Sequence, residues 1–96
     1  MPKLESDFKT KLISEIKDIF PGCMIFHLGE TQGIPDMLIL YKKKWATLEG
    51  KRNSKSKKQP NQLYYVEKMN DMSFSRFIYP ENKEEVLNDL QKSFKF

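Results

Sequence analysis

Acidic and basic side chains gather near the middle of this chain in a pattern that suits phosphate chemistry with a metal ion. Asp36 follows a Gly-x-Pro turn, and Glu49 and Lys51 follow two apolar runs of the kind that form β-strands. Residues two apart on a strand point to the same face, so Glu49 and Lys51 should emerge side by side. Neighbouring carboxylates repel, and a hard divalent cation with oxygen ligands, such as Mg²⁺, relieves that repulsion.

The register of the expected hairpin decides whether Asp36 joins this pair. If Leu40 pairs with Trp45, Asp36 lies opposite Glu49, with the two Cβ atoms roughly 4.5 to 5.5 Å apart. A slip of one residue moves Asp36 to the other face of the sheet, because side chains alternate along a strand. Only the first register brings two carboxylates together.

Basic residues flank the acidic pair in the sequence. Residues 42–58 contain eight basic side chains and one acid, whereas the whole chain has a net charge of +4. Cationic side chains attract and position phosphate groups without reading base sequence. A solvated lysine-rich loop is the alternative, but adjacency to the acids favours a DNA-binding role for Lys42, Lys43, Lys44, Arg52, Lys55, Lys57 and Lys58.

Length and composition limit what else the chain contains. With 96 residues, 39% hydrophobic and 31% charged, it suits a single globular domain (1–96) with a small core. Its charged start and the lack of an apolar run near ~20 residues argue against a signal peptide and a membrane span. Cys23 is the only cysteine, which excludes an internal disulfide and a cysteine-based zinc site. We therefore expect a cytoplasmic protein that does not bind membranes.

Hydrophobic periodicity predicts the elements that must position these residues. Helical spacing predicts helices over residues 4–20, 60–70 and 81–92. Strand-like runs cover residues 23–28, 37–41, 45–48 and 73–79. The predicted order is αβββαβα, an α/β fold, in which the second helix packs through Leu63, Tyr64, Val66 and Met69.

Of four further polar residues, Glu5 and Gln62 are candidates for the site, and His27 and Glu15 are less favoured. Glu5 points along the apolar stripe of the first helix, where a carboxylate needs a partner, although the helix dipole also favours an acid there. Gln62 starts the second helix and could reach a phosphate or a water, but glutamines at such positions are common without a role. His27, the only histidine, is more often structural than functional in such a setting. Glu15 lies off the stripe and should be solvated.

Four motifs combine in this element order: Glu5, Gly33-x-Pro35-Asp36, Glu49-x-Lys51 and Gln62. Together they resemble the PD-(D/E)xK nuclease superfamily, most closely its small stand-alone VRR-NUC and Holliday junction resolvase-like nucleases of phages and bacteria. The resemblance covers nearly the whole chain. It implies a restriction-endonuclease-like core, with a central mixed four-stranded sheet flanked by helices. It also implies a Mg²⁺-dependent DNA endonuclease, with Mn²⁺ as a substitute, that often acts as a homodimer on branched DNA in a bacterial cell or phage-infected host.

The resemblance also implies roles for individual residues. Lys51 would position the attacking water or balance charge on the phosphate, and Gln62 would orient a phosphate or a water. Gly50 stands where the family commonly has a β-branched or apolar residue, but its backbone carbonyl remains. The metal would be bound by Asp36, Glu49, that carbonyl of Gly50 and, directly or through water, Glu5.

Other functions remain compatible with the sequence. A sequence-specific endonuclease of the homing or restriction type could use the same core, although a long site needs many base-edge contacts from a short chain. A non-catalytic DNA-binding module could keep the fold, although binding alone does not require two carboxylates facing phosphate. RNA binding is less favoured, because the aromatic residues fall mostly on predicted core faces.

Overall fold

The predicted order of helices and strands is confirmed in three dimensions. A computed structural model of the protein describes residues 3–29 and 31–95, with side chains from Asp7 onward. The elements are α1 (Lys3–Ile19), β1 (Met24–His27), β2 (Met37–Tyr41), β3 (Lys44–Gly50), α2 (Pro60–Met72), β4 (Ser75–Ile78) and α3 (Lys83–Ser93). The protein therefore has an α/β fold of order αβββαβα. Within the described chain, every helix is too short or too polar to cross a lipid bilayer.

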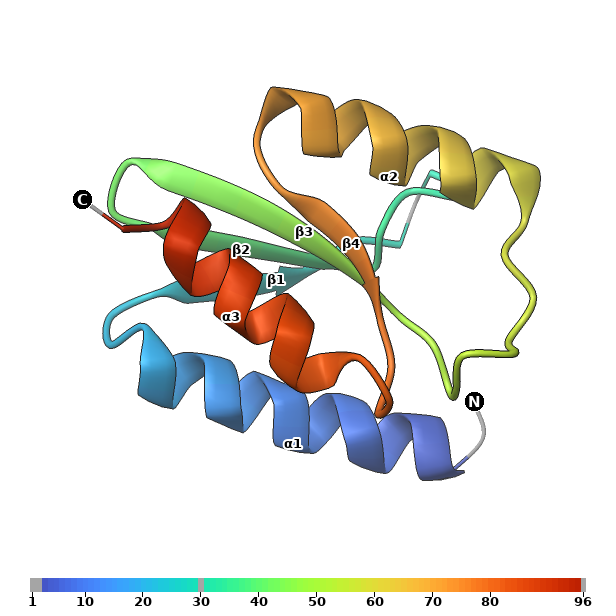
Figure 1. Ribbon diagram of the computed structural model, residues 1–96, viewed down its shortest axis with the longest axis horizontal. Coiled ribbons are helices and arrows are strands. Elements are labelled where there is room, and N and C mark those ends of the chain that lie inside the picture. Colours follow the sequence, from blue (N-terminus) through green and yellow to red (C-terminus); the bar gives the residue numbers. More distant parts are fainter. Residues whose placement is uncertain (1–2, 30, 96) are drawn as a thin grey trace.

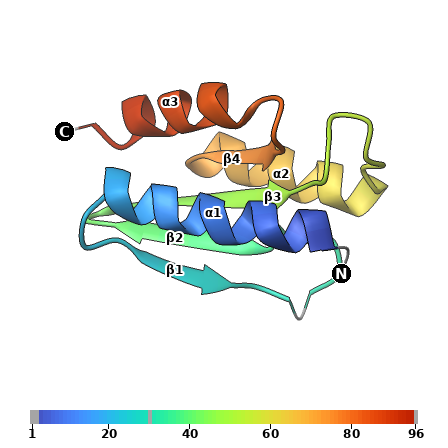
Figure 2. The ribbon, with the colours of Figure 1, turned by 90° about the horizontal axis from the view of Figure 1, so that it is seen from below.

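The four strands form one mixed, open sheet in the order β1-β2-β3-β4. Antiparallel pairing joins β1 to β2 and β2 to β3, whereas β4 runs parallel to β3. In Figure 1 the sheet runs between α1 below it and α2 above it, and Figure 2 shows β1 at one edge. The parallel step between β3 and β4 is made possible by α2, which crosses from one strand to the other.

The core lies where α1 and α3 cover one face of the sheet. Leu12 and Ile16, on the apolar stripe of α1, are both fully buried. Burying a side chain of this size stabilises the fold by about 1.5–3 kcal/mol. The buried cluster consists of Leu12, Ile16, Phe20, Met37, Ile39, Ala46, Leu48, Phe74, Ile78, Val86, Leu87, Leu90 and Phe94.

The opposite face of the sheet is covered only in part. Helix α2 packs on β3 and β4, and the hydroxyl of Thr47 donates to Sδ of Met69 at 3.4 Å. The predicted packing of Leu63 and Tyr64 is wrong, since these side chains are 41% and 55% exposed. A helix that rests on two strands buries only a narrow stripe, here including Val66.

Several element boundaries differ from the predictions for local reasons. β4 is shorter than residues 73–79 and α3 begins later than residue 81, because the Asn82 side chain occupies the connection. The backbone N–H of Tyr79 donates to Oδ1 of Asn82 at 2.9 Å, and Nδ2 of Asn82 donates to the carbonyl of Phe77 at 3.1 Å. β3 runs past residues 45–48, because its parallel pairing with β4 continues to Gly50 and Ile78.

Candidate active site

The hairpin register brings Asp36 and Glu49 together. Leu40 pairs with Trp45, and the continuation of this register places Asp36, which directly precedes β2, opposite Glu49 of β3. The backbone N–H of Asp36 donates to Oε1 of Glu49 at 3.1 Å. Oδ1 of Asp36 lies 3.5 Å from the backbone nitrogen of Gly50. The two carboxylates are therefore neighbours at the point where β2 begins and β3 ends.

The Gly-x-Pro turn fixes Asp36 against the start of α2. Gly33 has a φ of 89°, a conformation that favours glycine. A Cβ atom on Gly33 would also lie 2.5 Å from Cγ of Asn61, in the first turn of α2. The backbone N–H of Leu28 donates to the carbonyl of Asp36 at 2.9 Å. The loop is thus held between β1 and α2, which sets the position of the carboxylate.

Gln62 links Glu49 to Lys51. Nζ of Lys51 donates to Oε1 of Gln62 at 2.8 Å, and Nε2 of Gln62 donates to Oε2 of Glu49 at 3.3 Å. The same Oε1 accepts the backbone N–H of Gln59 at 3.0 Å, so it also completes the first turn of α2, which begins at Pro60. The sequence named Glu49-x-Lys51 and Gln62 as two separate motifs, and the structure joins them in one chain of hydrogen bonds.

Glu49 carries the strongest electrostatic perturbation at this site. Its side chain is buried, with the residue 8% exposed. Burial first, and the Asp36 carboxylate second, raise the pKa of Glu49 to about 7, while the charges of Lys51 and Lys9 oppose the rise. A cation at this place would favour the charged carboxylate.

Lys9 of α1 joins the site, although no sequence motif predicts it. Its ammonium forms an ion pair with the carboxylate of Asp36, and the two side chains are only 13% and 27% exposed. The signal was its position four residues after Glu5, which puts both residues on the same face of α1. The backbone of Glu5 lies in α1, but its side chain lies outside the described part of the structure.

The oxygen donors at this site suit a hard divalent cation. Mg²⁺ is usually bound through one or two carboxylates and keeps several waters. Asp36 and Glu49 supply such a pair, and the raised pKa of Glu49 shows that its charge is not fully compensated. Among the side chains that the structure describes, no cluster of three or more His, Cys, Asp or Glu could hold a metal ion. A cation bound here would therefore also draw on the backbone and on water.

One group of basic residues follows the carboxylates directly. Arg52, Lys55 and Lys57 are exposed in the loop that continues from Lys51. Nζ of Lys58 lies 5.2 Å from the centre of the Phe77 ring, in a cation–π contact. This group remains at the end of β3 where Asp36 and Glu49 lie.

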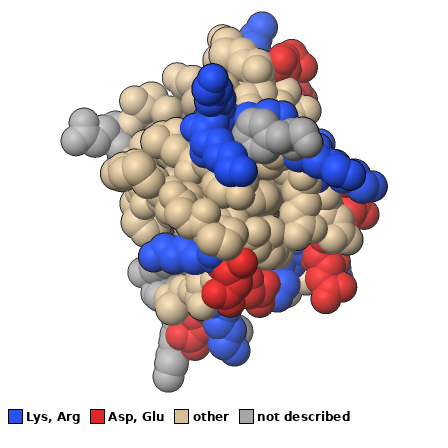
Figure 3. Space-filling model, turned by 90° about the vertical axis from the view of Figure 1, so that its left-hand side faces the viewer, with Lys and Arg blue, Asp and Glu red and all other residues tan. Residues whose placement is uncertain are grey.

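The other group lies at the opposite end of the sheet. Lys42 and Lys43 form the β2–β3 turn, and Lys44 lies five residue steps from Glu49 along β3, about 17 Å at ~3.3 Å for each step. Nζ of Lys44 donates to the carbonyls of Ser93 and Lys95, at 2.9 and 3.2 Å. Figure 3 faces this end, where Lys and Arg side chains, together with Asp and Glu side chains in the lower half of the view, surround a centre that is mainly uncharged. These three lysines are therefore close to the acids in sequence but not in space, and their role in DNA binding stays a prediction.

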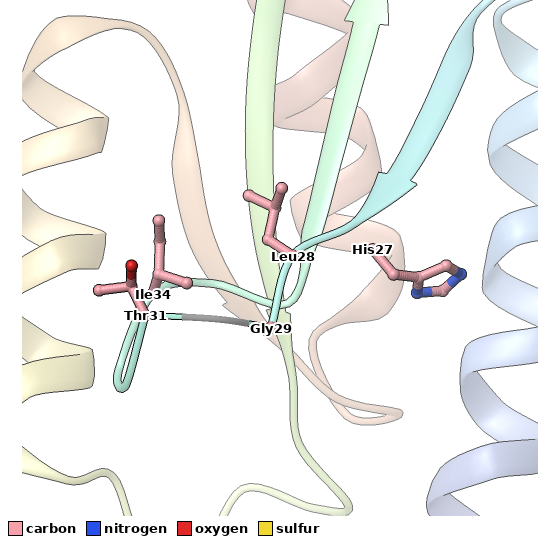
Figure 4. Close-up of a pocket in the computed structure, with 5 residues that line it drawn as sticks. All are labelled: His27, Leu28, Gly29, Thr31 and Ile34. Atoms are coloured by element: carbon pink, nitrogen blue, oxygen red, sulfur yellow. The ribbon is translucent and has the colours of Figure 1, made fainter.

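His27 and Glu15 lie outside the carboxylate cluster. His27 borders a hollow of about 310 Å³, whose other lining residues are Leu28, Gly29, Thr31 and Ile34. Figure 4 shows the imidazole turned toward α1 and away from the side chains of those residues. Glu15 instead accepts a hydrogen bond from Nζ of Lys83 at 2.8 Å, which ties α1 to α3.

The end of β3 thus combines a pair of carboxylates, two lysines and a glutamine. Comparison of the chain with protein-family models, curated proteins and solved structures finds no significant match. What this cluster can do follows from its own chemistry: it is a candidate cation site with an amine on either side.

Proposed function

We propose that this protein is a divalent-metal-dependent DNA endonuclease that hydrolyses phosphodiester bonds. The observation that carries the proposal is the meeting of Asp36, Glu49 and Lys51 at one end of β3. The αβββαβα order supports it, because this is the element order of the PD-(D/E)xK nucleases that the motifs resemble. Branched DNA is the proposed substrate class.

The proposed metal is Mg²⁺, with Mn²⁺ as a substitute, held by Asp36, Glu49 and the backbone carbonyl of Gly50. When bound, such an ion polarises the phosphate and lowers the pKa of a coordinated water. The raised pKa of Glu49 supports a cation at this position, since burial and the Asp36 carboxylate both oppose its charged form. Glu5 is proposed to complete the shell from α1, directly or through water.

Lys51 and Gln62 are proposed to act on the phosphate. The ammonium of Lys51 is fixed by Oε1 of Gln62 at 2.8 Å, and it places positive charge where negative charge develops on the phosphate during hydrolysis. Because Gln62 also donates to Glu49, its loss should misplace both functional groups. The neighbouring basic loop would hold the DNA backbone without reading sequence, through Arg52, Lys55, Lys57 and Lys58.

A cleavage assay with purified protein tests the proposal. Four-way, flap, duplex and single-stranded DNA would each be incubated with Mg²⁺, Mn²⁺ or EDTA, with Asp36→Asn as the control. We expect metal-dependent cleavage that is strongest on a branched substrate, and loss of cleavage but not of DNA binding in Asp36→Asn. Cleavage by the variant, freed of host nuclease, or no cleavage under any condition would contradict the proposal.

Cut positions distinguish this function from its alternatives. A chain of 96 residues offers few elements for reading a long base sequence, so we expect cuts to follow the branch point when the DNA sequence is scrambled. Cuts that follow a sequence would instead favour a homing- or restriction-type enzyme. A non-catalytic DNA-binding module would hold DNA equally well in EDTA and in Mg²⁺ and leave it uncut.

The proposal includes a homodimer that acts in the cytoplasm. Met24 and Phe26 of β1 are 55% and 43% exposed, and they support an apolar contact between two copies. Pairing places Phe26 beside Leu38, and Leu38 beside Thr47, so these side chains share the sheet face on which α2 covers β3 and β4. Light scattering should give twice the mass of one chain, and the mass of a single chain would exclude the dimer.

A further inference from the structure

Gly50 and Lys9 occupy the same place in the structure. A Cβ atom on Gly50 would lie 2.7 Å from Cε of Lys9, and 3.4 and 3.5 Å from its Cγ and Cδ. The aliphatic part of Lys9 therefore crosses β3 through the space that the side chain of residue 50 would fill. Any residue larger than glycine would compete with Lys9 for that passage.

The passage delivers a positive charge to the carboxylate pair. The ammonium of Lys9 pairs with Asp36, and the Lys9 side chain as a whole is only 13% exposed. Its charge also acts on Glu49, as one of the two lysines that oppose the rise in the pKa of that residue. Lys9 therefore supplies cationic charge at the place where the proposed function requires a divalent cation.

We propose that Lys9 is a built-in counter-ion of the carboxylate pair, and that a divalent cation must displace its ammonium from Asp36 in order to bind. This inference rests on the proposed function, since it concerns the same cation site. An ammonium and a divalent cation on one carboxylate repel each other strongly at a partly buried site. The metal affinity of the protein therefore depends on the exchange of the Lys9 ammonium for the metal ion at Asp36. Gly50 makes this possible, because its missing side chain leaves the space that Lys9 occupies.

Substitution of Lys9 tests this exchange directly. Lys9→Met keeps most of the aliphatic chain and removes the charge, and Lys11→Met is the matched control, because Lys11 is an exposed lysine of the same helix. Mn²⁺ binding would be measured on the full chain by calorimetry and by the electron spin resonance of free Mn²⁺. We expect Lys9→Met to bind Mn²⁺ at least about tenfold more tightly than wild type. Lys11→Met should match wild type.

Gly50→Ala provides a second test that leaves Lys9 in the sequence. The added methyl group would meet Cε of Lys9 at 2.7 Å, and a flexible side chain can move away where a backbone could not. We expect Gly50→Ala to tighten Mn²⁺ binding in the same direction as Lys9→Met, by a smaller factor. In the double variant with Lys9→Met and Gly50→Ala, the added alanine should change Mn²⁺ affinity little relative to Lys9→Met alone, because no ammonium remains to be displaced.

Thermal unfolding gives a readout that is independent of cleavage. In EDTA, Lys9→Met should unfold at a lower temperature than wild type, because Asp36 then loses its ion pair and only Lys51 offsets the carboxylates. Saturating Mn²⁺ should raise its midpoint by more than it raises that of wild type. Suppose that wild type binds Mn²⁺ and that Asp36→Asn abolishes this binding. If Lys9→Met then binds Mn²⁺ no more tightly than wild type, the inference about Lys9 is wrong, while the proposed function stands. If neither wild type nor Lys9→Met binds Mn²⁺ in a way that depends on Asp36, both the inference and the proposed function are wrong.

Discussion

The two ends of β3 are held by different forces. At the hairpin end, the ring centres of Phe20, Tyr41 and Phe94 lie 5.0 to 6.1 Å apart, in tilted, edge-on and stacked pairs. Lys44 joins this end by donating hydrogen bonds to two carbonyls at the end of α3. Apolar packing and satisfied backbone groups stabilise this region.

At the other end, charge dominates. Asp36 and Glu49 adjoin one another, and the pKa of Glu49 is raised to about 7. Lys9 and Lys51 offset the carboxylates from opposite faces of the sheet, one arriving from α1 and the other linked to α2 through Gln62. Perturbed acids of this kind cluster at functional sites more than in ordinary surfaces.

Lysines only a few residues apart in sequence thus have unrelated roles. Lys44 completes the hydrogen bonding of a helix end, whereas Lys51 lies beside a buried carboxylate that lacks full compensation. Substitutions at the hairpin end should therefore reduce stability, and substitutions at the carboxylate end should reduce activity. Four experiments test this division.

Glu49→Ala should have the greatest effect, and it should act on cleavage. Removal of one carboxylate of the proposed cation site should lower the cleavage rate at least about a hundredfold. DNA binding should survive, because the basic loop is intact. Single-turnover cleavage and a binding titration on the same branched DNA would measure both. A variant that cleaves at a rate near that of wild type would show that the carboxylate end is not the active site.

Phe94→Ala is the matching change at the hairpin end. Phe94 is 2% exposed, so its truncation should cost about 3–5 kcal/mol of unfolding free energy, measured by urea denaturation. The cleavage rate per folded molecule, measured in the cold, should change little. A loss of cleavage in folded Phe94→Ala protein would show that the two ends are coupled.

Glu49→Gln should remove a pH dependence of stability in the metal-free protein. Since the pKa of Glu49 is raised from 4.5 to about 7 on folding, the folded state binds more protons than the unfolded state between these values. Wild-type stability should therefore fall as the pH rises through this window and level off above pH ~7. Gln does not titrate, so the variant should be more stable than wild type by about 1–2 kcal/mol at pH ~8.

Denaturation in EDTA across pH would measure this difference, with Glu67→Gln as the control on the exposed side of α2. The advantage of Glu49→Gln should vanish below the ordinary pKa of a glutamate, where both proteins are neutral at this position. An advantage that persists unchanged in acid would contradict the assignment of the pH dependence to Glu49.

The smallest expected effect is on DNA binding, when lysines at the carboxylate end of β3 are compared with lysines at its hairpin end. The logarithm of the DNA-binding constant falls linearly with the logarithm of the salt concentration, with a slope of about −0.9 for each neutralised phosphate. Replacing Lys55 and Lys57 with alanine should reduce the magnitude of this slope by about 1.8. Replacing Lys42 and Lys43 should have a weaker effect, because they lie at the far end of β3. Equal effects would show that bound DNA extends along the whole sheet.

The order of the elements could be predicted from the sequence, because the periods of apolar residues define helices and strands. The meeting of Asp36 with Glu49 was one of two possibilities, since a slip of one residue in the hairpin moves Asp36 to the other face of the sheet. The structure decided between them by pairing Leu40 with Trp45. It also decided the exposure of Leu63 and Tyr64, which depends on how many strands α2 covers.

The places where the lysines act could be seen only in three dimensions. Lys9 reaches Asp36 across 27 positions of sequence, and Lys44 reaches the end of α3 across 49 and 51 positions. Such contacts depend on how the helices dock against the sheet, which no local pattern specifies. A long, flexible side chain can then reach whichever carboxylate or carbonyl the docking places within its range.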